Sequence, residues 1–332
     1  MGNSPGTPKI GHVLDRRPAI QLTRLLLVGK RRGEAGERAP RIGWRTAAVT
    51  GAATVLAGSS AGTAWWAASR LLMAQAGAAR GVIGRDTSKP PEADGIYTAG
   101  CLTPERWRTG KHADLHLMIF GDSTAAGVGC VVADEVPGVR LARGLAMATG
   151  QRIRLSTKAI SGATSKGLSG QVDAMFVAGP PPDAAVILIG ANDITKKHSV
   201  RASARRLAAA VARLRRADSV VVVGTCPNLG TVTAIPQPLR TVVHNWSVRL
   251  AKAQTVATAV AGGRPVPMGY LLAPEFRAQP ELLFAADGFH PSAAGYELAA
   301  AQLLPVLLEA LGEATPAASP LGRDVDSIGT RE

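Results

Sequence analysis

Ser123 has the surroundings of a serine nucleophile. It follows an apolar run, 115–120, and the pair Gly121-Asp122. A short run rich in aliphatic residues, ended by glycine and followed by small residues, is typical of a buried strand that turns sharply into a helix. Open α/β folds bind ligands at the carboxyl ends of such strands, where this serine would lie. The alternative is structural, because a serine after Gly-Asp is also common as a turn residue or helix N-cap.

Asp287 and His290 supply the other two groups that a serine nucleophile requires. A serine hydroxyl is a weak nucleophile near neutral pH, so it needs a base within hydrogen-bond reach and a third group that orients the base. His290 is the candidate base and Asp287, three residues earlier, is the candidate orienting carboxylate. One loop can carry both groups. The alternative is that a histidine before Pro291 marks only the entrance of the following helix.

Two further stretches place glycine or polar residues after an apparent strand. Gly162 follows the strand-like run 152–160, and Asn192 and Asp193 follow the run 184–189. The carboxyl ends of parallel strands meet at one edge of a sheet, so these residues would lie beside the serine. Asn-Asp is also a common turn sequence, and Asp193 is interpreted as a structural acceptor within that turn.

In this order, the four stretches resemble the SGNH, or GDSL, hydrolase family. That family has a Gly-Asp-Ser block, an isolated glycine, a Gly-x-Asn-Asp block and an Asp-x-x-His block, and the resemblance covers roughly residues 115–311. It implies a serine esterase with Ser123, His290 and Asp287 as its catalytic triad, acting through an acyl-enzyme intermediate.

The same resemblance implies an oxyanion hole with three donors. These are the backbone N–H groups of Ser123 and Gly162 and the side-chain amide of Asn192. Glycine suits position 162, because a side chain there would obstruct the approach of backbone to substrate.

Alternating strand-like and helix-like segments predict an α/β domain over residues 113–312. The resemblance to the SGNH family implies that this domain has a flavodoxin-like three-layer α/β/α fold, and the strand-like runs predict a mostly parallel five-stranded sheet. Its fifth strand would lie within 264–272 at a sheet edge, because prolines occur there. A helix is expected from Ser292 to Leu311, kinked or interrupted at Pro305.

The N-terminal third predicts export. Residues 1–45 are basic and predicted to be disordered, and 46–69 form an uncharged stretch long enough to cross a bilayer as a hydrophobic helix. The basic block would keep the N-terminus cytoplasmic and leave the catalytic domain at the cell membrane, outside the cytoplasm. A cleaved signal, which would release the enzyme to the envelope, and an Ala-rich soluble helix are the alternatives. Residues 70–112 are expected to form a linker and domain entry, and 313–332 a disordered tail.

Composition excludes several other functions. The net charge is +14, but residues 1–45 hold ten basic and three acidic residues and so carry half of it. Nucleic-acid binding is not expected, since no stacking platform or reading motif is present. No metal or nucleotide motif occurs, so no cofactor and no metal are expected. Cys101 and Cys130 could form a disulfide if the domain is exported, whereas Cys226 is expected to be a buried free thiol.

The predicted substrate is a small-molecule, lipid or glycan acyl ester. Small residues at 124–127 favour an open site and short acyl chains over a deep lipid tunnel. Two other functions stay open at this point. One is an acyltransferase that moves the acyl group to a sugar or lipid hydroxyl with the same site, and the other is a non-catalytic module that binds the cell envelope.

Overall fold

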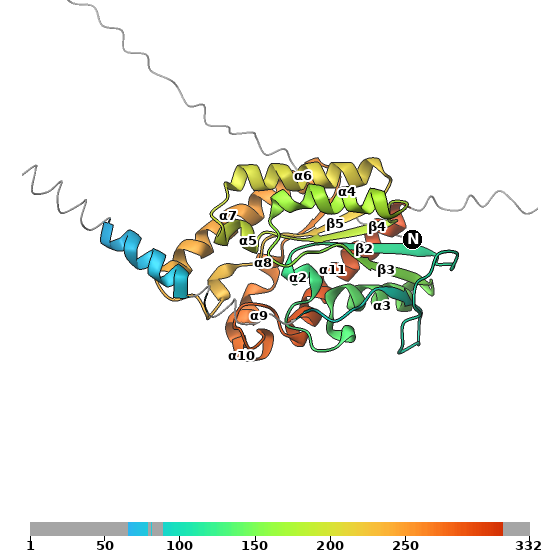
Figure 1. The fold of residues 1–332 in the computed structure, drawn as a ribbon, viewed down its shortest axis with the longest axis horizontal. Coiled ribbons are helices and arrows are strands. Elements are labelled where there is room, and N and C mark those ends of the chain that lie inside the picture. The colour runs from blue at the N-terminus through green and yellow to red at the C-terminus, as the bar shows by residue number, and fades with distance from the viewer. Residues whose placement is uncertain (1–65, 79–80, 82–88, 315–332) are drawn as a thin grey trace, which may run out of the picture. The chain divides into compact units, whose positions relative to one another are not determined.

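The computed structural model describes residues 66–78, 81 and 89–314. Residues 89–314 form a sheet of six strands with helices on both faces (Figure 1). The strand order is β1-β3-β2-β4-β5-β6. The strands are β1 (Gly95–Tyr97), β2 (Leu115–Gly121), β3 (Ile153–Thr157), β4 (Ala184–Leu188), β5 (Val220–Gly224) and β6 (Arg264–Val266). The predicted three-layer α/β architecture is confirmed.

The sheet has one strand more than predicted. Strands β2 to β6 are the five expected ones and all run parallel, whereas β1 adds to β3 in the antiparallel direction. Strand β1 lies inside the predicted linker 70–112, so the folded unit begins before residue 113. Tyr97 is 1% exposed and donates a hydrogen bond to the Ala93 carbonyl. Three residues are too few for an alternating pattern, so pairing with a distant strand decides this element.

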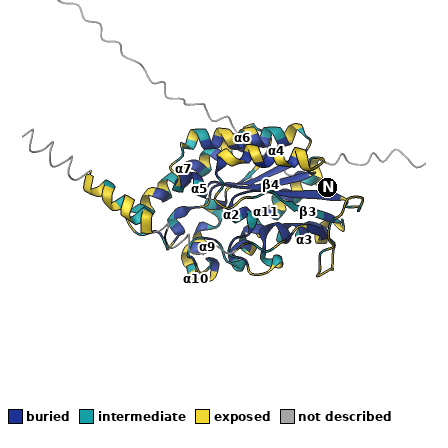
Figure 2. Cartoon of the chain, viewed as in Figure 1, coloured by how far each residue is buried: buried dark blue, intermediate teal, exposed yellow. Residues whose placement is uncertain are grey.

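Alternating side chains of β2 divide the core into two layers. Leu117 and Ile119 pack with α3 (Pro137–Thr149) and α11 (Ala293–Ala314) on one face. Met118 and Phe120 pack with α4 (Leu168–Ala178) and α6 (Val200–Arg216) on the other. Both layers are buried (Figure 2). The period of two in strand side chains therefore gives the sheet two apolar faces that need helical cover.

The edge strand agrees with its local sequence signal, whereas the last long helix does not. Strand β6 is the predicted edge strand, and Pro265 pairs only with β5. Helix α11 runs uninterrupted through Pro305 to Ala314, beyond the predicted boundary at 312. Leu303 and Leu307, on either side of the proline, are both fully buried. Packing on the sheet thus keeps the helix together where the sequence predicts a kink or interruption.

The carboxyl ends of the five parallel strands lie at one edge, and each is followed by a short helical turn. In chain order these are α2 (Ser123–Ala126), η2 (Ser165–Gly167), α5 (Ala191–Thr195), η3 (Leu229–Thr231) and α8 (Met268–Leu271). The remaining elements are η1 (Ala133–Glu135), α7 (Leu239–Val260), α9 (Ala273–Ala278) and α10 (Pro280–Leu283). This edge is where the predicted site residues are found.

The predicted membrane span 46–69 lies outside the described residues except for 66–69, which are helical. The predicted segments 1–45 and 315–332 also lie outside them. Within the described part, α11 is the helix that is long and apolar enough to cross a membrane, and it packs on the sheet.

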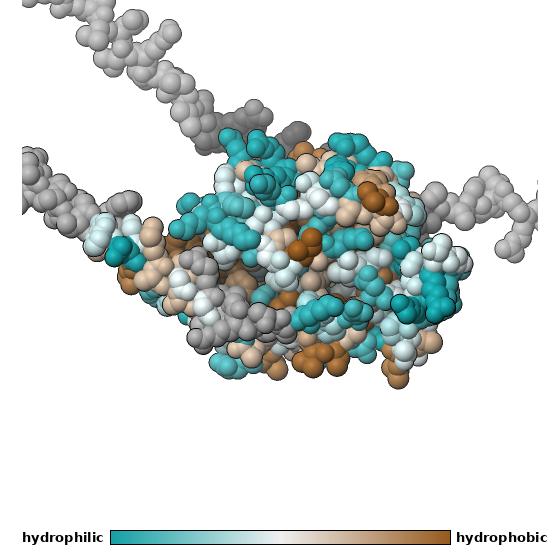
Figure 3. Space-filling model, in the orientation of Figure 1, coloured by the Kyte–Doolittle hydropathy of each residue, from teal (hydrophilic) through white to brown (hydrophobic). Residues whose placement is uncertain are grey.

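The outer face of α6 carries exposed arginines, and hydrophilic side chains cover this part of the molecule (Figure 3). All three cysteines are unpaired, with Cys101 exposed and Cys130 and Cys226 buried. The disulfide left open by the sequence is not formed in this structure.

Candidate active site

Ser123 begins helix α2, immediately after the sharp turn that ends β2. Gly121 has a φ of +139°, and a Cβ at this position would lie 1.9 Å from the carbonyl oxygen of Leu188 on the neighbouring strand. Only glycine fits a turn that is both strained for other residues and pressed against a strand. Asp122 is the N-cap of α2, since its carboxylate accepts a hydrogen bond from Thr124 N at 3.0 Å. The capping role is therefore filled by Asp122, which leaves the Ser123 hydroxyl available.

Gln171 holds this turn from the opposite side. This residue of α4 accepts a hydrogen bond from Gly121 N at 2.9 Å and donates one to the Gly121 carbonyl at 2.7 Å. Sequence reasoning missed it. The available signal is a glutamine on the apolar face of a helix, between Leu168 and Met175, where the side chain must find polar partners inside the protein.

Ser123, His290 and Asp287 form a continuous chain of hydrogen bonds. The His290 ring contacts Ser123 Oγ through Nε2 at 2.9 Å and Asp287 Oδ2 through Nδ1 at 2.5 Å. All three residues are buried, with exposures of 8%, 7% and 7% in that order. The structure thus brings together a hydroxyl, an imidazole and a carboxylate from positions 123 and 287–290.

The loop that carries His290 is itself firmly held. Ala285 N donates to the His290 carbonyl at 2.8 Å, and Asp287 Oδ1 accepts from the backbone N–H groups of Phe289 and His290, both at 2.9 Å. Burial acts to raise the pKa of Asp287, but the hydrogen bonds from the His290 ring and these two backbone groups outweigh burial and hold the pKa below its usual range. Asp287 is therefore ionised near neutral pH and orients the imidazole through Nδ1.

Gly162 and Asn192 lie on the two loops next to the nucleophile. Register places Gly121 opposite Leu188, so the loop after β4 starts beside the turn that bears Ser123. Gly162 is exposed and has a φ of +76°, and a Cβ there would meet no protein atom within 4 Å. Within the protein, backbone conformation is what favours glycine at this position.

Three donors on these loops have no partner within the described part of the chain. They are the backbone N–H groups of Ser123 and Gly162 and the side-chain amide of Asn192. Asn192 is half-buried on the short helix α5. Donors that are held in place but unpaired are available to a ligand oxygen.

Asp193 ties these loops together. Its carboxylate accepts hydrogen bonds from Ser165 N at 2.9 Å and from the hydroxyls of Ser165 and Ser203, each at 2.7 Å. The His198 ring lies 3.2 Å away, and Lys196 Nζ donates to the Gly162 carbonyl at 2.6 Å. The structure agrees with the interpretation of Asp193 as a structural acceptor and adds that its partners come from three separate segments.

The amino-acid sequence of the middle of the chain decides its family. Residues 119–298 match the GDSL-like lipase/acylhydrolase family. This chain belongs to that family. The match spans the Gly-Asp-Ser, Gly-x-Asn-Asp and Asp-x-x-His stretches described above, so the family predicted from the sequence is confirmed.

One curated relative is similar over most of its length. The chain is 62% identical over 261 residues to the GDSL-like esterase Rv1075c of Mycobacterium tuberculosis, which covers 79% of this chain and 83% of the relative. The chain is accordingly an ester hydrolase of the GDSL type, as predicted.

Solved structures include similar chains at lower identity. TesA is 22% identical with a TM-score of 0.48, covering 60% of this chain and 99% of TesA. A catalytic mutant of Axe2, an acetylxylan esterase from Geobacillus stearothermophilus, is 19% identical with a TM-score of 0.46 and covers 60% and 95%.

Asp122 is a further buried acid at the GDSL site. It is 2% exposed, and burial raises the pKa of its carboxyl to about 6, against the hydrogen bond from Thr124 N, which acts to lower it. Sequence reasoning treated this residue only as part of the turn. Among the described residues, no group of three or more His, Cys, Asp or Glu side chains is arranged to hold a metal ion.

Proposed function

We propose that this esterase hydrolyses short-chain carboxylic esters through a Ser123-His290-Asp287 triad and an acyl-enzyme intermediate. The observation that carries the proposal is the unbroken hydrogen-bond chain from Ser123 Oγ through the His290 ring to Asp287. This is the arrangement that activates a hydroxyl, because the base is in reach of the nucleophile and the carboxylate orients the base.

Acylation follows from this geometry. His290 Nε2 takes the proton of Ser123 Oγ as the oxygen attacks the ester carbonyl carbon. Negative charge develops on the carbonyl oxygen, where the unpaired donors of Ser123 N, Gly162 N and Asn192 would receive it. The imidazolium is stabilised by ionised Asp287 and returns the proton to the leaving alcohol as the carbon–oxygen bond breaks.

Deacylation repeats these steps with water. His290 removes a proton from a water molecule as its oxygen attacks the acyl carbon, and the same donors stabilise the second tetrahedral intermediate. Collapse of that intermediate releases the carboxylic acid, and the proton on His290 returns to Ser123 Oγ. No other group is required for the cycle to close.

The enzyme is further proposed to act at or outside the membrane. Support comes from the uncharged stretch 46–69 and the basic block 1–45, which favour a cytoplasmic N-terminus and an external catalytic domain. Expression of the full chain in a bacterial host, followed by fractionation and protease treatment of intact cells, tests this. A cytoplasmic, protease-protected enzyme would contradict it. Release with a new N-terminus just after Ala74-Gln75-Ala76, which resembles a small-x-small cleavage site, would favour a cleaved signal.

The catalytic proposal is tested with p-nitrophenyl acetate, butyrate and longer esters. Ser123→Ala is expected to lower kcat/KM by at least about ten-thousandfold and to abolish labelling by a fluorophosphonate probe. Ser169→Ala is the matched control, since this serine is exposed on α4. Equal rates for the wild type and Ser123→Ala would reject the triad. Adding an alcohol acceptor and analysing products distinguishes hydrolysis from acyl transfer.

A further inference from the structure

Four exposed cations lie around the loops that carry the oxyanion donors. They belong to η2, the end of α5 and the first turn of α6, and they are Lys166, Lys196, Lys197 and Arg201. We refer to these four residues as the basic rim. Lys196 Nζ donates a hydrogen bond to the Gly162 carbonyl at 2.6 Å, so the rim starts directly beside one of the oxyanion glycines.

Buried contacts fix the segments that carry the basic rim. The Asp193 carboxylate accepts hydrogen bonds from the hydroxyls of Ser165 and Ser203, each at 2.7 Å. Ser165 directly precedes Lys166, and Ser203 lies two residues after Arg201. The segments η2, α5 and α6 therefore meet at one carboxylate, which keeps the backbone of the rim next to the oxyanion donors.

The positive charge of the rim is not neutralised within the described part of the chain. None of its four cations forms a salt bridge with a described residue. Residues 161–172 and 190–217 contain nine basic residues and one acidic residue, Asp193, which is fully buried. An exposed group of charges of one sign attracts molecules of the opposite charge.

Helix stability does not account for Arg201. The amino end of a helix carries a partial positive charge, so its first turn favours acidic residues and disfavours basic ones. The first turn of α6 has no acidic residue, whereas Arg213, Arg215 and Arg216 lie in the last turn, where the same dipole favours cations. Departures from local preference of this kind are expected at functional sites, so the charge of Arg201 is better explained by an anion that binds there.

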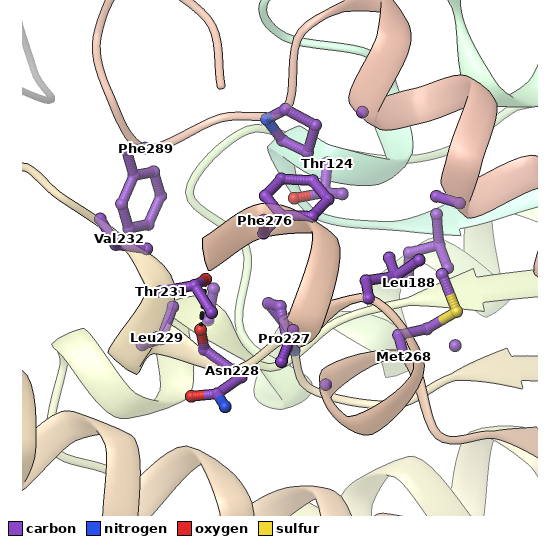
Figure 4. A pocket seen from close by; sticks show the side chains of 18 of the residues that line it. Thr124, Leu188, Pro227, Asn228, Leu229, Thr231, Val232, Met268, Phe276 and Phe289 are labelled. Carbon is purple, nitrogen blue, oxygen red and sulfur yellow. Dashed lines mark hydrogen bonds between the residues drawn. The ribbon is translucent and has the colours of Figure 1, made fainter. Parts of the chain in front are cut away.

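A cavity beside the nucleophile carries no such charge. It borders Thr124, and the apolar side chains of Pro227, Leu229, Met268 and Phe276 surround it (Figure 4). Among the described residues, no lysine or arginine contributes to its wall. The environment of the site is thus uneven, with an apolar space on one hand and the basic rim on the other.

We propose that the basic rim recognises a negatively charged group on the substrate, so that this esterase acts preferentially on anionic esters. The substrate class is an ester that carries a carboxylate, phosphate or sulfate outside the bond that is cleaved. The inference rests on the proposed function, because the oxyanion donors would bring the ester carbonyl next to Gly162. Charge of one sign around a site raises the local concentration and the association rate of a substrate of opposite charge.

Two matched pairs of esters test this preference and locate the charge. 3-Carboxy-4-nitrophenyl acetate has a carboxylate on the alcohol part that 4-nitrophenyl acetate lacks. Mono-4-nitrophenyl adipate has one on the acyl part, in place of the terminal methyl of 4-nitrophenyl hexanoate. For at least one pair, the wild-type ratio of anionic to neutral kcat/KM should fall at least about fivefold from about 0.05 M to about 1 M NaCl, where the Debye length is about 3 Å. A ratio that is independent of salt in both pairs would overturn the inference.

Arg201→Glu tests the rim directly, and Arg216→Glu is its matched control. Both arginines are exposed on α6, and the fifteen residues between them correspond to about 22 Å along the helix. At about 0.1 M salt the Debye length is about 10 Å, so the distant charge is screened. Arg201→Glu should lower the anionic-to-neutral ratio about fivefold, because the charge changes by two units, and should leave the neutral ester within about twofold of the wild type. Arg216→Glu should keep the wild-type ratio.

Lys166→Glu repeats the test from a separate element and should act like Arg201→Glu. Thermal unfolding separates charge recognition from damage to the fold, since a carboxylate in the first turn of α6 should not lower the midpoint. Equal losses for anionic and neutral esters, or equal changes in Arg201→Glu and Arg216→Glu, would reject the role of the rim.

Failure of this inference differs from failure of the triad. If Ser123→Ala abolishes hydrolysis of all four esters while the rim variants keep the wild-type ratio, the rim does not recognise the substrate and the triad stands. If Ser123→Ala retains hydrolysis, the triad is wrong whatever the ratio.

Discussion

The active site has two parts that differ in how their polar groups are satisfied within the protein. In the first part, Ser123, His290 and Asp287 are buried and hydrogen-bonded to one another. In the second part, Gly162 is exposed and Asn192 half-buried, and their donors have no partner among the described residues. In the proposed mechanism, the proton-transfer groups are thus complete before a substrate binds, whereas the oxyanion donors would be satisfied only by the substrate.

This difference has a physical basis. A buried imidazole and carboxylate must be paired inside the protein, since isolated charged groups are costly to bury. Oxyanion donors contribute to catalysis only if no protein group already occupies them, and their positions must then be held by other contacts. Asp193 supplies such contacts through its hydrogen bonds with Ser165 and Ser203. Four sets of substitutions test this division.

Asp287→Asn should inactivate the proton-transfer groups of the first part. The amide cannot stabilise imidazolium and favours the wrong ring tautomer, so kcat should fall by about ten-thousandfold. Steady-state hydrolysis of p-nitrophenyl butyrate measures this, with Asp173→Asn, at an exposed ion pair with Arg213, as control. A loss of tenfold or less would mean that Asp287 does not orient the base.

Asn192→Ala should weaken stabilisation of the oxyanion and leave the proton-transfer groups intact. Loss of one oxyanion donor lowers kcat by about one hundred- to one thousandfold. Because the amide has no partner among the residues that the structure describes, the midpoint of thermal unfolding should stay close to that of the wild type. Asn245→Ala, at an exposed position of α7, is the control. Asn192→Asp should lose more activity than Asn192→Ala, since a carboxylate would repel the developing charge.

Asp122→Asn asks whether the buried carboxyl next to Ser123 lowers the free energy of unfolding when it is ionised. The folded-state pKa of Asp122 is about 6, above the ordinary value of about 3.9, so its contribution to stability is fully present below about pH 4 and is lost as pH rises through 6. Asparagine retains the N-cap without the charge. Relative to the wild type, the variant should therefore gain up to about 3 kcal/mol between pH 4 and 7.

Urea unfolding of both proteins across this pH range measures that gain. The difference between the two curves isolates Asp122, because the other titrating groups are common to both. A constant difference would show that burial does not shift this carboxyl.

Ser165→Ala and Ser203→Ala form a matched pair that tests whether Asp193 positions the Gly162 loop. Both hydroxyls are buried and donate to Asp193 Oδ1 at 2.7 Å, but Ser165 follows the loop of Gly162 and Ser203 belongs to α6. Each change should lower the free energy of unfolding by about 1 kcal/mol. Only Ser165→Ala should also lower kcat, by a few-fold. Equal kinetic effects would mean that Asp193 does not position the Gly162 loop separately.

Much of the fold and the site could be predicted because the relevant signals are local. Strands β2 to β5 are short aliphatic runs, and the edge position of β6 follows from Pro265. Strand β1 could not be predicted in the same way, because three residues carry no pattern and their burial depends on pairing with β3. Helix α11 passes through Pro305 for the same reason, as packing of its buried leucines outweighs a local helix-breaking signal.

The residue types of the site, their order and the loops that carry them could be read from local sequence, because glycine turns, strand ends and the Asp-x-x-His spacing are properties of neighbouring residues. Tertiary packing is what brings Ser123 and His290, 167 residues apart, within hydrogen-bond distance. It also decided that Gln171 holds the nucleophile turn and that Asp193 joins three segments. Such contacts depend on how distant elements pack across the sheet, which no local pattern encodes.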